Sequence, residues 1–313
     1  MLRLGFDVGG TYIKAGVVDT NLIKIVSRRI IPFPSDASYT DVAELVYALS
    51  SEMAAELKIQ NCRFKSVGLA LPGILNEDRS VLKRAYNLGW YDAPVRAAVQ
   101  NYFSDVPVYL ENDANAALIA ERHGALRGCK NVVLLTLGTG VGSGVLLNGA
   151  LLRGESGSSA ELGHVRLFPD GPKCSCGNRG CIEALCSATW LTEEGKKSVI
   201  NSPTSLMYKK TDGDAGKITP KTVFDSAKEG DGYALAIFNK YVDSLAAAVA
   251  YCADRFNAGA VAIGGGISMA GFFLFSALKA RVKEMHGCRC RILPAMFAND
   301  AGIIGAALLY KFQ

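Results

Sequence analysis

The chain has 313 residues, of which half are hydrophobic and a fifth are charged, and its formal net charge is +5. This is the composition of a globular protein with two lobes, and it excludes a disordered or fibrous chain. The charge is too mild, and Lys and Arg are too dispersed, for a nucleic-acid-binding protein. No apolar run is as long as a membrane span, and the first residues do not resemble a signal peptide. We therefore expect a cytoplasmic protein with reduced cysteines and neither a membrane nor a nucleic-acid partner.

The first part of the chain alternates between strand and helix patterns. The expected strands are residues 2–8, 12–19, 25–33, 66–73 and 106–113, and the expected helices are 41–59 and 114–126. The strands are short apolar runs, whereas the helices carry apolar residues three and four positions apart. Such alternation predicts a mixed α/β fold.

The pattern of the first turn returns later in the chain. The segment 131–149 is again strand, Gly-rich turn and strand, and its Gly138–Thr139 repeats Gly10–Thr11. Further elements are a helix over 232–256, a strand over 260–266 and a final helix over 301–312. The repeat predicts two similar α/β halves around a cleft.

Three Gly-rich turns follow predicted strands. They are DVGGT at 7–11, LGTGVGSG at 137–144 and IGGGIS at 263–268. Glycine lets backbone N–H groups approach an anion closely. None has the spacing of a P-loop or a Rossmann turn, and a plain β-hairpin explains any one of them equally well. Together they predict a nucleotide site, where Asp7 is either a water-mediated Mg²⁺ ligand or a hydrogen-bonded turn carboxylate.

In YLENDANAAL, Asn112 and Asp113 stand where an apolar strand gives way to a helix. An N-cap is the ordinary role of an aspartate at such a place, and the residues alone favour it. The alternative is a catalytic base, since phosphoryl transfer uses one carboxylate aimed at the attacking hydroxyl.

The stretch ELGHVRLFPDGPKCSCGNRGCIEALC, residues 161–186, gathers a histidine and four cysteines. His164, Cys174, Cys176 and Cys181 offer one nitrogen and three sulfurs, the closed tetrahedral set of a structural Zn²⁺ site. A disulfide is disfavoured because cytoplasmic thiols stay reduced. Cys174 and Cys176 are also too close in sequence to bridge comfortably.

The motifs FDVGGTYIKAGVVD, ENDANAAL, TLGTGVGSGVLLNG, AELGHVRL, CSCGNRGCIEA and AIGGGIS occur in an order that resembles the ROK family of sugar kinases and regulators. The resemblance runs from residue 4 to about 305, and ELGH with CxCGxxGCxE is its most specific part. Two small departures are Ala160, where many members have Gly, and Lys14, which follows Thr11 later than in other members. The resemblance implies a duplicated ribonuclease-H-like fold of the actin and hexokinase type, with ATP in the cleft and a sugar beside it.

The resemblance also implies a role for individual residues. Asp113 would accept the proton of the attacking sugar hydroxyl, which reverses the preference for an N-cap. The implied sugar-binding residues are Gly73, Asn112, Asp113, Glu161, His164 and Glu183. The implied ATP-binding residues are Asp7, Gly9, Gly10, Thr11, Lys14, Thr139, Gly140, Gly142, Gly264, Gly265 and Gly266.

We expect a small lobe of residues 1–113 with the C-terminal helix 299–313, and a large lobe of residues 114–298 that carries the zinc loop. The predicted function is an ATP-dependent hexose kinase for the 6-hydroxyl of glucose, with Mg²⁺ and structural Zn²⁺, as a homodimer or homotetramer. Kinases of N-acetylmannosamine, N-acetylglucosamine, allose or fructose are the alternatives. A sugar-sensing regulator is disfavoured, because such family members carry a winged helix-turn-helix ahead of the first Gly turn, which here begins at residue 6.

Overall fold

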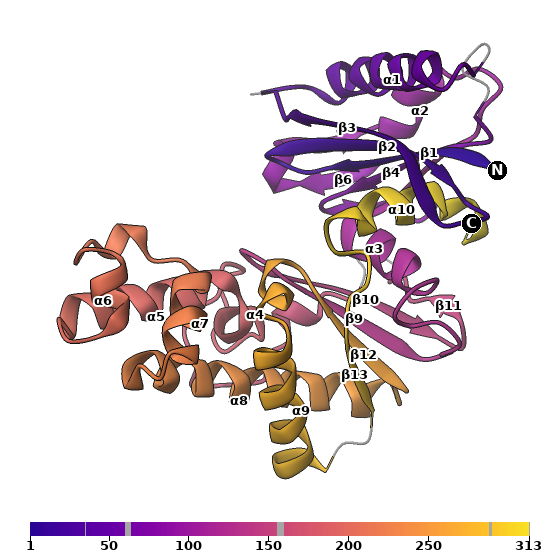
Figure 1. Cartoon of the computed structure of the whole chain (residues 1–313). Helices are drawn as coiled ribbons and strands as arrows, with labels where there is room; N and C mark the ends of the chain where they lie inside the picture. The colour runs from indigo at the N-terminus through magenta and orange to yellow at the C-terminus, as the bar shows by residue number, and fades with distance from the viewer. Residues whose placement is uncertain (35, 60–63, 155–159, 288–289, 313) are drawn as a thin grey trace. The chain divides into compact units, whose positions relative to one another are not determined.

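A computed structural model describes the whole chain except residues 35, 60–63, 155–159, 288–289 and 313 (Figure 1). The chain forms two compact units. The first consists of residues 1–128, 144–160 and 296–313, and the second of residues 129–143 and 161–295. We keep the predicted small and large lobes, divided after residue 113, as a proposal.

The described strands form three sheets. The first has the order β3-β2-β1-β4-β8, with β1 Leu2–Val8, β2 Tyr12–Asp19, β3 Lys24–Pro32, β4 Val67–Leu71 and β8 Val108–Asn112. The second has the order β11-β10-β9-β12-β13, with β9 Val132–Leu137, β10 Val141–Leu147, β11 Ala150–Leu151, β12 Ala260–Gly264 and β13 Arg291–Pro294. A small sheet contains β5 Ile74–Leu75, β6 Leu82–Ala85 and β7 Trp90–Ala93.

The two large sheets have equivalent topology. In the first, β1 is antiparallel to β2 and parallel to β4, which is parallel to β8. In the second, β10 is antiparallel to β11, while β12 runs parallel to both β9 and β13. The central strands β4 and β12 are buried along their whole length, as their unbroken apolar sequences predict. The duplication predicted from the sequence is therefore confirmed.

The structure describes ten helices. Their bounds are α1 Tyr39–Glu56, α2 Val95–Gln100, α3 Asp113–Glu121, α4 Glu183–Cys186, α5 Ala188–Asn201, α6 Leu206–Lys210, α7 Pro220–Lys228, α8 Gly232–Arg255, α9 Phe272–His286 and α10 Ala301–Ala307. In the first unit, Figure 1 shows α1 and α2 on one face of the sheet and α10 on the other. Short 3₁₀ helices include η2 Tyr86–Leu88, η3 Leu162–His164, η5 Gly266–Ala270 and η7 Leu309–Lys311.

Two helices end earlier than their apolar patterns predict. Helix α3 stops at Glu121 instead of residue 126, because the Glu121 carboxylate accepts hydrogen bonds from the backbone N–H groups of Ala125, Met296 and Phe297. The turn is thereby tied to a distant part of the chain. Helix α10 stops at Ala307, where the N–H of Leu308 is shared between two carbonyls and the chain tightens into η7.

Helix α10 lies unusually close to the backbone of its neighbours. A Cβ atom at Gly5 would stand 2.0 Å from the carbonyl oxygen of Ile303, and one at Gly68 would stand 1.9 Å from that of Ala306. On the opposite side of the helix, a Cβ at Gly305 would stand 1.7 Å from the carbonyl oxygen of Ala116 in α3. Glycine at these three positions allows β1, β4, α3 and α10 to pack backbone against backbone.

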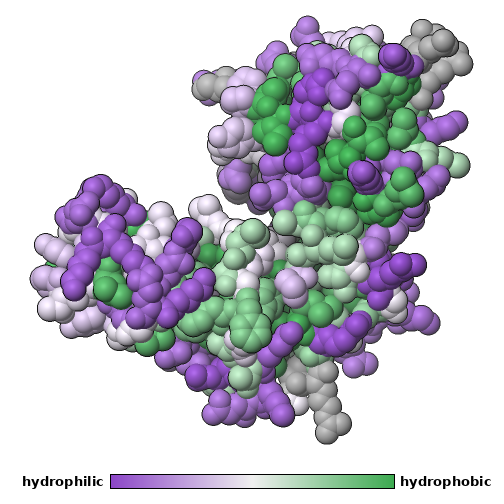
Figure 2. All heavy atoms as spheres, in the orientation of Figure 1, coloured by the Kyte–Doolittle hydropathy of each residue, from purple (hydrophilic) through white to green (hydrophobic). Residues whose placement is uncertain are grey.

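The surface over α5, α6 and α7 is mostly hydrophilic (Figure 2). Within the part of the chain that the structure describes, no helix combines the length and the apolar composition needed to cross a membrane.

Candidate active site

In the first unit, the predicted site residues lie at one edge of the sheet. Strands β1, β4 and β8 are parallel neighbours, so their carboxyl ends meet at the same edge. The turn 9–11 follows β1, Gly73 follows β4, and Asp113 follows β8. The side-chain amide of Asn112 donates a 3.2 Å hydrogen bond to the carbonyl oxygen of Gly73. The fold thus brings together residues that lie up to a hundred positions apart in the sequence.

Asp113 is the first residue of α3, and the N-cap is Asn112. The Asn112 side-chain oxygen accepts from the N–H groups of Ala114 and Asn115, at 3.0 and 3.2 Å. Asp113 also accepts from the Ala114 N–H, at 2.8 Å, but its side chain is exposed at the sheet edge. The capping function expected for an aspartate here is already supplied by its neighbour.

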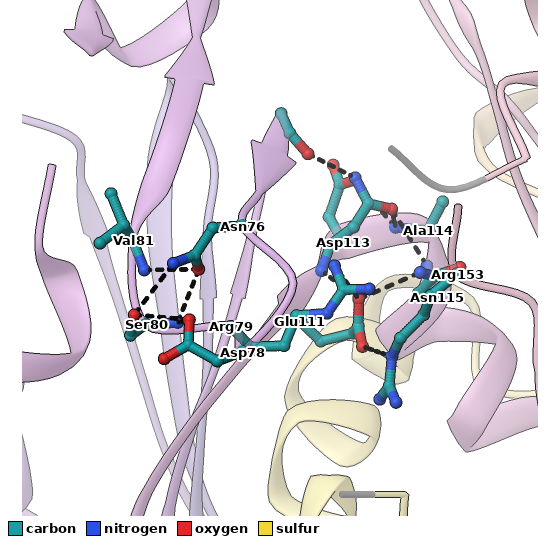
Figure 3. A network of polar contacts seen from close by, with 12 residues as sticks. Asn76, Asp78, Arg79, Ser80, Val81, Glu111, Asp113, Ala114, Asn115 and Arg153 are labelled. Atoms are coloured by element: carbon teal, nitrogen blue, oxygen red, sulfur yellow. Dashed lines mark hydrogen bonds and ion pairs between the residues drawn. The ribbon is translucent and has the colours of Figure 1, made fainter. Parts of the chain in front are cut away.

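A buried ion-pair network lies directly behind Asp113 (Figure 3). Glu111, fully buried, accepts from the Nε of Arg153 at 2.8 Å, and Arg79 lies 3.7 Å from its other oxygen. That second oxygen also accepts from the Asn112 N–H and from the side-chain amide of Asn115, both at 3.0 Å. Glu111 therefore holds the first turn of α3 in place.

Sequence reasoning missed this network. Burial lowers the pKa of Arg79, an effect to which Arg153 adds and which Glu111 opposes. The position of Glu111 at the end of the apolar run VPVYL could have predicted the network, since a charged residue in a buried strand is rarely without a partner.

The turn after β1 carries an ion pair. Asp7 and Lys14 face each other across β1 and β2, and the Lys14 ammonium lies 2.9 Å from a carboxylate oxygen of Asp7. The turn is closed by a 3.0 Å hydrogen bond from the Gly9 N–H to the carbonyl of Tyr12. Gly10 packs against Asn87, where a Cβ would stand 2.9 Å from a backbone oxygen. Lys14 thus reaches the predicted site despite its shifted position in the sequence.

Gly73 has a local reason to be glycine. Its φ is +102°, and a Cβ there would stand 2.2 Å from the carbonyl oxygen of Arg84. This close approach within the first unit explains the residue without reference to a ligand.

In the second unit, two glycine turns are adjacent. Strands β9 and β12 are parallel, with Gly264 opposite Thr136, so the turns that follow them lie at the same edge. A Cβ at Gly265 would stand 2.4 Å from the Leu137 carbonyl oxygen. The carbonyl of Gly138 accepts from the Ala188 N–H at 2.7 Å, which fixes the first turn to the start of α5.

Glu183 is fixed beside this turn. One of its oxygens accepts from the Val141 N–H at 3.0 Å, and the other accepts from the Ser175 hydroxyl at 2.5 Å. A Cβ at Gly140 would stand 2.5 Å from the Glu183 carboxylate. The absence of a side chain at Gly140 is therefore explained first by Glu183.

The predicted zinc ligands converge. The ligand atoms of His164, Cys174, Cys176 and Cys181 all lie within 4.8 Å of one another. The His164 Nδ1 is 3.6 Å from the Cys174 sulfur, and the sulfurs of Cys176 and Cys181 are 3.7 Å apart. Zn–S and Zn–N bonds of about 2.3 and 2.0 Å give tetrahedral edges of about 3.8 Å between sulfurs and about 3.5 Å between sulfur and nitrogen. The four residues fit a zinc ion.

The loop around these ligands needs its glycines. At Gly180, with φ of +71°, a Cβ would stand 1.5 Å from the Phe168 carbonyl oxygen. Burial raises the pKa of Cys181 to about 12, whereas a backbone N–H from Asn178 lowers the pKa of Cys176 to about 7. One cysteine is thus already poised to be a thiolate.

The segment carrying Glu161 packs on the start of β10. The N–H of Leu162 donates to the Ser143 hydroxyl at 3.0 Å, and a Cβ at Gly163 would stand 2.1 Å from the Val141 carbonyl oxygen. Glu161 itself is exposed, and its carbonyl accepts from the His164 N–H at 3.0 Å. The second unit thus gathers Glu161, the zinc ligands, Glu183 and both glycine turns.

The repeated sheets, with glycine turns and a carboxylate at the strand ends, define the two-lobe fold of the actin and hexokinase class. The ROK family model matches residues 3–313, and the chain belongs to this family.

Three relatives illustrate the similarity. The glucokinase of Thermotoga maritima is 36% identical over 317 residues, covering 98% of this chain and 96% of that protein. The N-acetylmannosamine kinase of Salmonella typhi is 29% identical over 309 residues, covering 99% of this chain and 98% of that protein. A ROK family glucokinase from Streptomyces griseus, solved in complex with glucose and AMPPNP, is 30% identical with a TM-score of 0.81, and 99% of each chain is covered.

Proposed function

We propose that this ROK family chain is an ATP-dependent sugar kinase that phosphorylates the 6-hydroxyl of glucose. The observation that carries the proposal is the exposed carboxylate of Asp113, set at the carboxyl edge of a sheet beside the turn 9–11 and Gly73. The N-cap of α3 is Asn112, so helix capping does not account for the aspartate at position 113. The similarity to glucokinases along nearly the whole chain supports glucose as the substrate.

Asp113 acts as the base. Its carboxylate accepts the proton of the 6-hydroxyl as that oxygen forms a bond to the γ-phosphorus of ATP and ADP leaves. Glu111, through Asn112 and Asn115, keeps the first turn of α3 rigid, so the carboxylate stays aimed at the hydroxyl. Most of the catalytic work in phosphoryl transfer is such positioning, together with charge neutralisation.

ATP binds at the glycine turns. Gly9, Gly10 and Thr11 follow β1, and Thr139, Gly140 and Gly142 follow β9, where backbone N–H groups contact phosphate oxygens. Asp7 would hold Mg²⁺ through water, and the ion would neutralise phosphate charge. Lys14, paired with Asp7, adds a further positive charge.

The adenine lies beside the turn Gly264–Gly266. A pocket of about 250 Å³ adjoins Gly266, and its lining includes the apolar Phe224, Ile267 and Met269 and the charged Lys221, Asp225 and Lys228. Apolar walls combined with a few polar groups suit a purine ring.

Gly266→Ala tests the nucleotide site. A Cβ there would meet no atom of the protein within 4 Å, so the fold is unchanged while the adenine is obstructed. We expect the KM for ATP to rise by roughly tenfold, which corresponds to about 1.4 kcal/mol, with little change in the KM for sugar. Gly232→Ala, which also meets open space, is the matched control. A selective rise in the KM for sugar would show that the turn serves the other ligand.

The residues proposed to bind the sugar are Gly73, Asn112, Asp113, Glu161, His164 and Glu183. A carboxylate accepts from two neighbouring hydroxyls at once, which suits a polyol. His164 would hold the metal through Nδ1, which lies 3.6 Å from the Cys174 sulfur, and its second ring nitrogen would then bind a sugar hydroxyl.

Zinc has a structural role in this proposal. Three sulfurs and one nitrogen complete a tetrahedron, so no position remains for a reacting water. The ion would fix the loop that carries Glu183 and the segment that carries Glu161.

A coupled ADP-release assay over a panel of hexoses tests the substrate. We expect the highest kcat/KM with glucose, ahead of N-acetylmannosamine, N-acetylglucosamine, allose and fructose. N-acetylmannosamine is the second candidate because a relative named for that sugar aligns along nearly the whole chain. A higher kcat/KM with N-acetylmannosamine than with glucose would overturn glucose as the substrate but would leave the proposed kinase activity standing. A homodimer or homotetramer in the cytoplasm completes the proposal.

A further inference from the structure

The first unit contains a pocket of about 960 Å³ that includes none of the residues assigned above to sugar, ATP or zinc. It is strongly basic. Its charged or titratable lining residues are Arg122, His123, Arg127, Arg153 and Lys311. They come from three separate segments: the turn after α3, the chain after β11, and η7. Among the lining residues that the structure describes, none is acidic.

Most of this charge has no acidic partner. Arg153 pairs with Glu111, but no described carboxylate forms an ion pair with Arg122, Arg127 or Lys311. The carboxylate next to Arg122 in sequence, that of Glu121, is occupied by three backbone N–H groups. Three cations from two segments, the turn after α3 and η7, therefore line one pocket without an acidic partner among the described residues.

The histidine of the pocket is held neutral. Its Nδ1 lies 3.1 Å from the Ile119 carbonyl oxygen, to which it donates, so Nε2 accepts from the Lys311 ammonium at 3.2 Å. Burial lowers the pKa of His123, and the charges of Lys311, Arg122 and Arg127 lower it further, while the hydrogen bond to Ile119 opposes the change. An additional positive charge, such as a protonated His123, is disfavoured in this pocket, whereas a bound anion would be favoured.

One hydrogen-bond donor of the Arg153 guanidinium is unpaired among the described residues. Its Nε binds Glu111, but its Nη2 atom is buried without a hydrogen-bond partner. A buried donor left unpaired costs free energy, and an acceptor in the pocket would remove that cost. Arg153 also joins the pocket to the network behind Asp113 (Figure 3).

We propose that this pocket binds a small phosphorylated anion. Its volume is that of a small-molecule site. Guanidinium groups donate to phosphate oxygens in pairs, and three of the five groups are arginines. The ligand carries at least two negative charges, because Arg122, Arg127 and Lys311 each lack a counter-charge. The proposal concerns binding alone and does not depend on the proposed kinase activity.

Isothermal titration of the full chain tests this, without ATP, sugar or Mg²⁺. The probes are inorganic phosphate, pyrophosphate and glucose 6-phosphate. We expect saturable binding of about one anion per chain, and the tightest probe identifies the chemical class of the ligand. Arg127→Ala with Lys311→Ala should weaken it by at least tenfold, since each removed cation contributes a charge-assisted hydrogen bond. Both side chains are exposed, so the thermal midpoint of the apo protein should stay close to that of the parent.

Lys209→Ala with Lys283→Ala is the matched control. It makes the same change in net charge at exposed positions outside the pocket and should bind like the parent. Two results would overturn the proposal. One is the absence of saturable binding with all three probes. The other is binding that the pocket variant retains and that ATP displaces, because the anion would then occupy the nucleotide turns.

Discussion

Asp113→Asn should lower the turnover of sugar-dependent ADP release by about 10²–10⁴-fold, the usual contribution of a general base. The amide keeps the size of the side chain but cannot take the proton of the attacking hydroxyl. The KM values for ATP and sugar should change much less than kcat, because the substituted group acts mainly in the transition state.

The structure indicates that this variant should change catalysis without changing folding stability. Asn112 and not Asp113 caps α3, and Asp113 is exposed, so the substitution should leave the thermal midpoint nearly unchanged. Asn112→Ala supplies the contrast, since it removes the cap and should cost about 1 kcal/mol of folding stability. Turnover of Asp113→Asn within tenfold of the parent would remove Asp113 from the mechanism.

Cys181→Ser should abolish stoichiometric zinc binding and sugar phosphorylation together. Cys181 is completely buried, and its sulfur lies 3.7 Å from that of Cys176, so the ligand set cannot close without it. The loop that orients Glu183 would then lose its anchor. Binding of ATP should largely survive, because the glycine turns belong to other segments.

Elemental analysis of the purified protein decides this prediction, with about one zinc expected per chain. Cys186→Ala is the matched control. Cys186 is equally buried and lies in α4, but it is not among the four clustered ligands. A zinc-free parent with full activity would refute the structural role of zinc.

The positions of the strands along the chain could be predicted from the sequence because they depend on repeated local patterns. The turn after residue 8 and its later copy each separate two apolar runs, and both copies fold as expected. The clustering of His164, Cys174, Cys176 and Cys181 was equally predictable, since residue type and spacing match a tetrahedral ligand set.

Long-range contacts were not accessible in this way. The end of α3 depends on Glu121 binding Met296 and Phe297, which are 175 and 176 residues away. The burial of Glu111 depends on Arg79 and Arg153, which no periodicity connects to it. The sequence suggests ATP as the reason for glycine at position 140, but a Cβ atom there would also stand 2.5 Å from the carboxylate of Glu183. A helix pattern or a glycine turn does not specify the side chain against which it will pack.

The close packing of α10 has a consequence for the order in which the protein is made. Residues 301–307 leave the ribosome after residues 161–295, yet their contacts are with β1, β4 and α3 of the first unit. During synthesis, the glycine-lined face of β1 and β4 stays uncovered until residues 301–307 have been translated. The first unit is therefore completed only after the second has been synthesised, and β1, which carries Asp7, and α3, which begins at Asp113, acquire their final support only then.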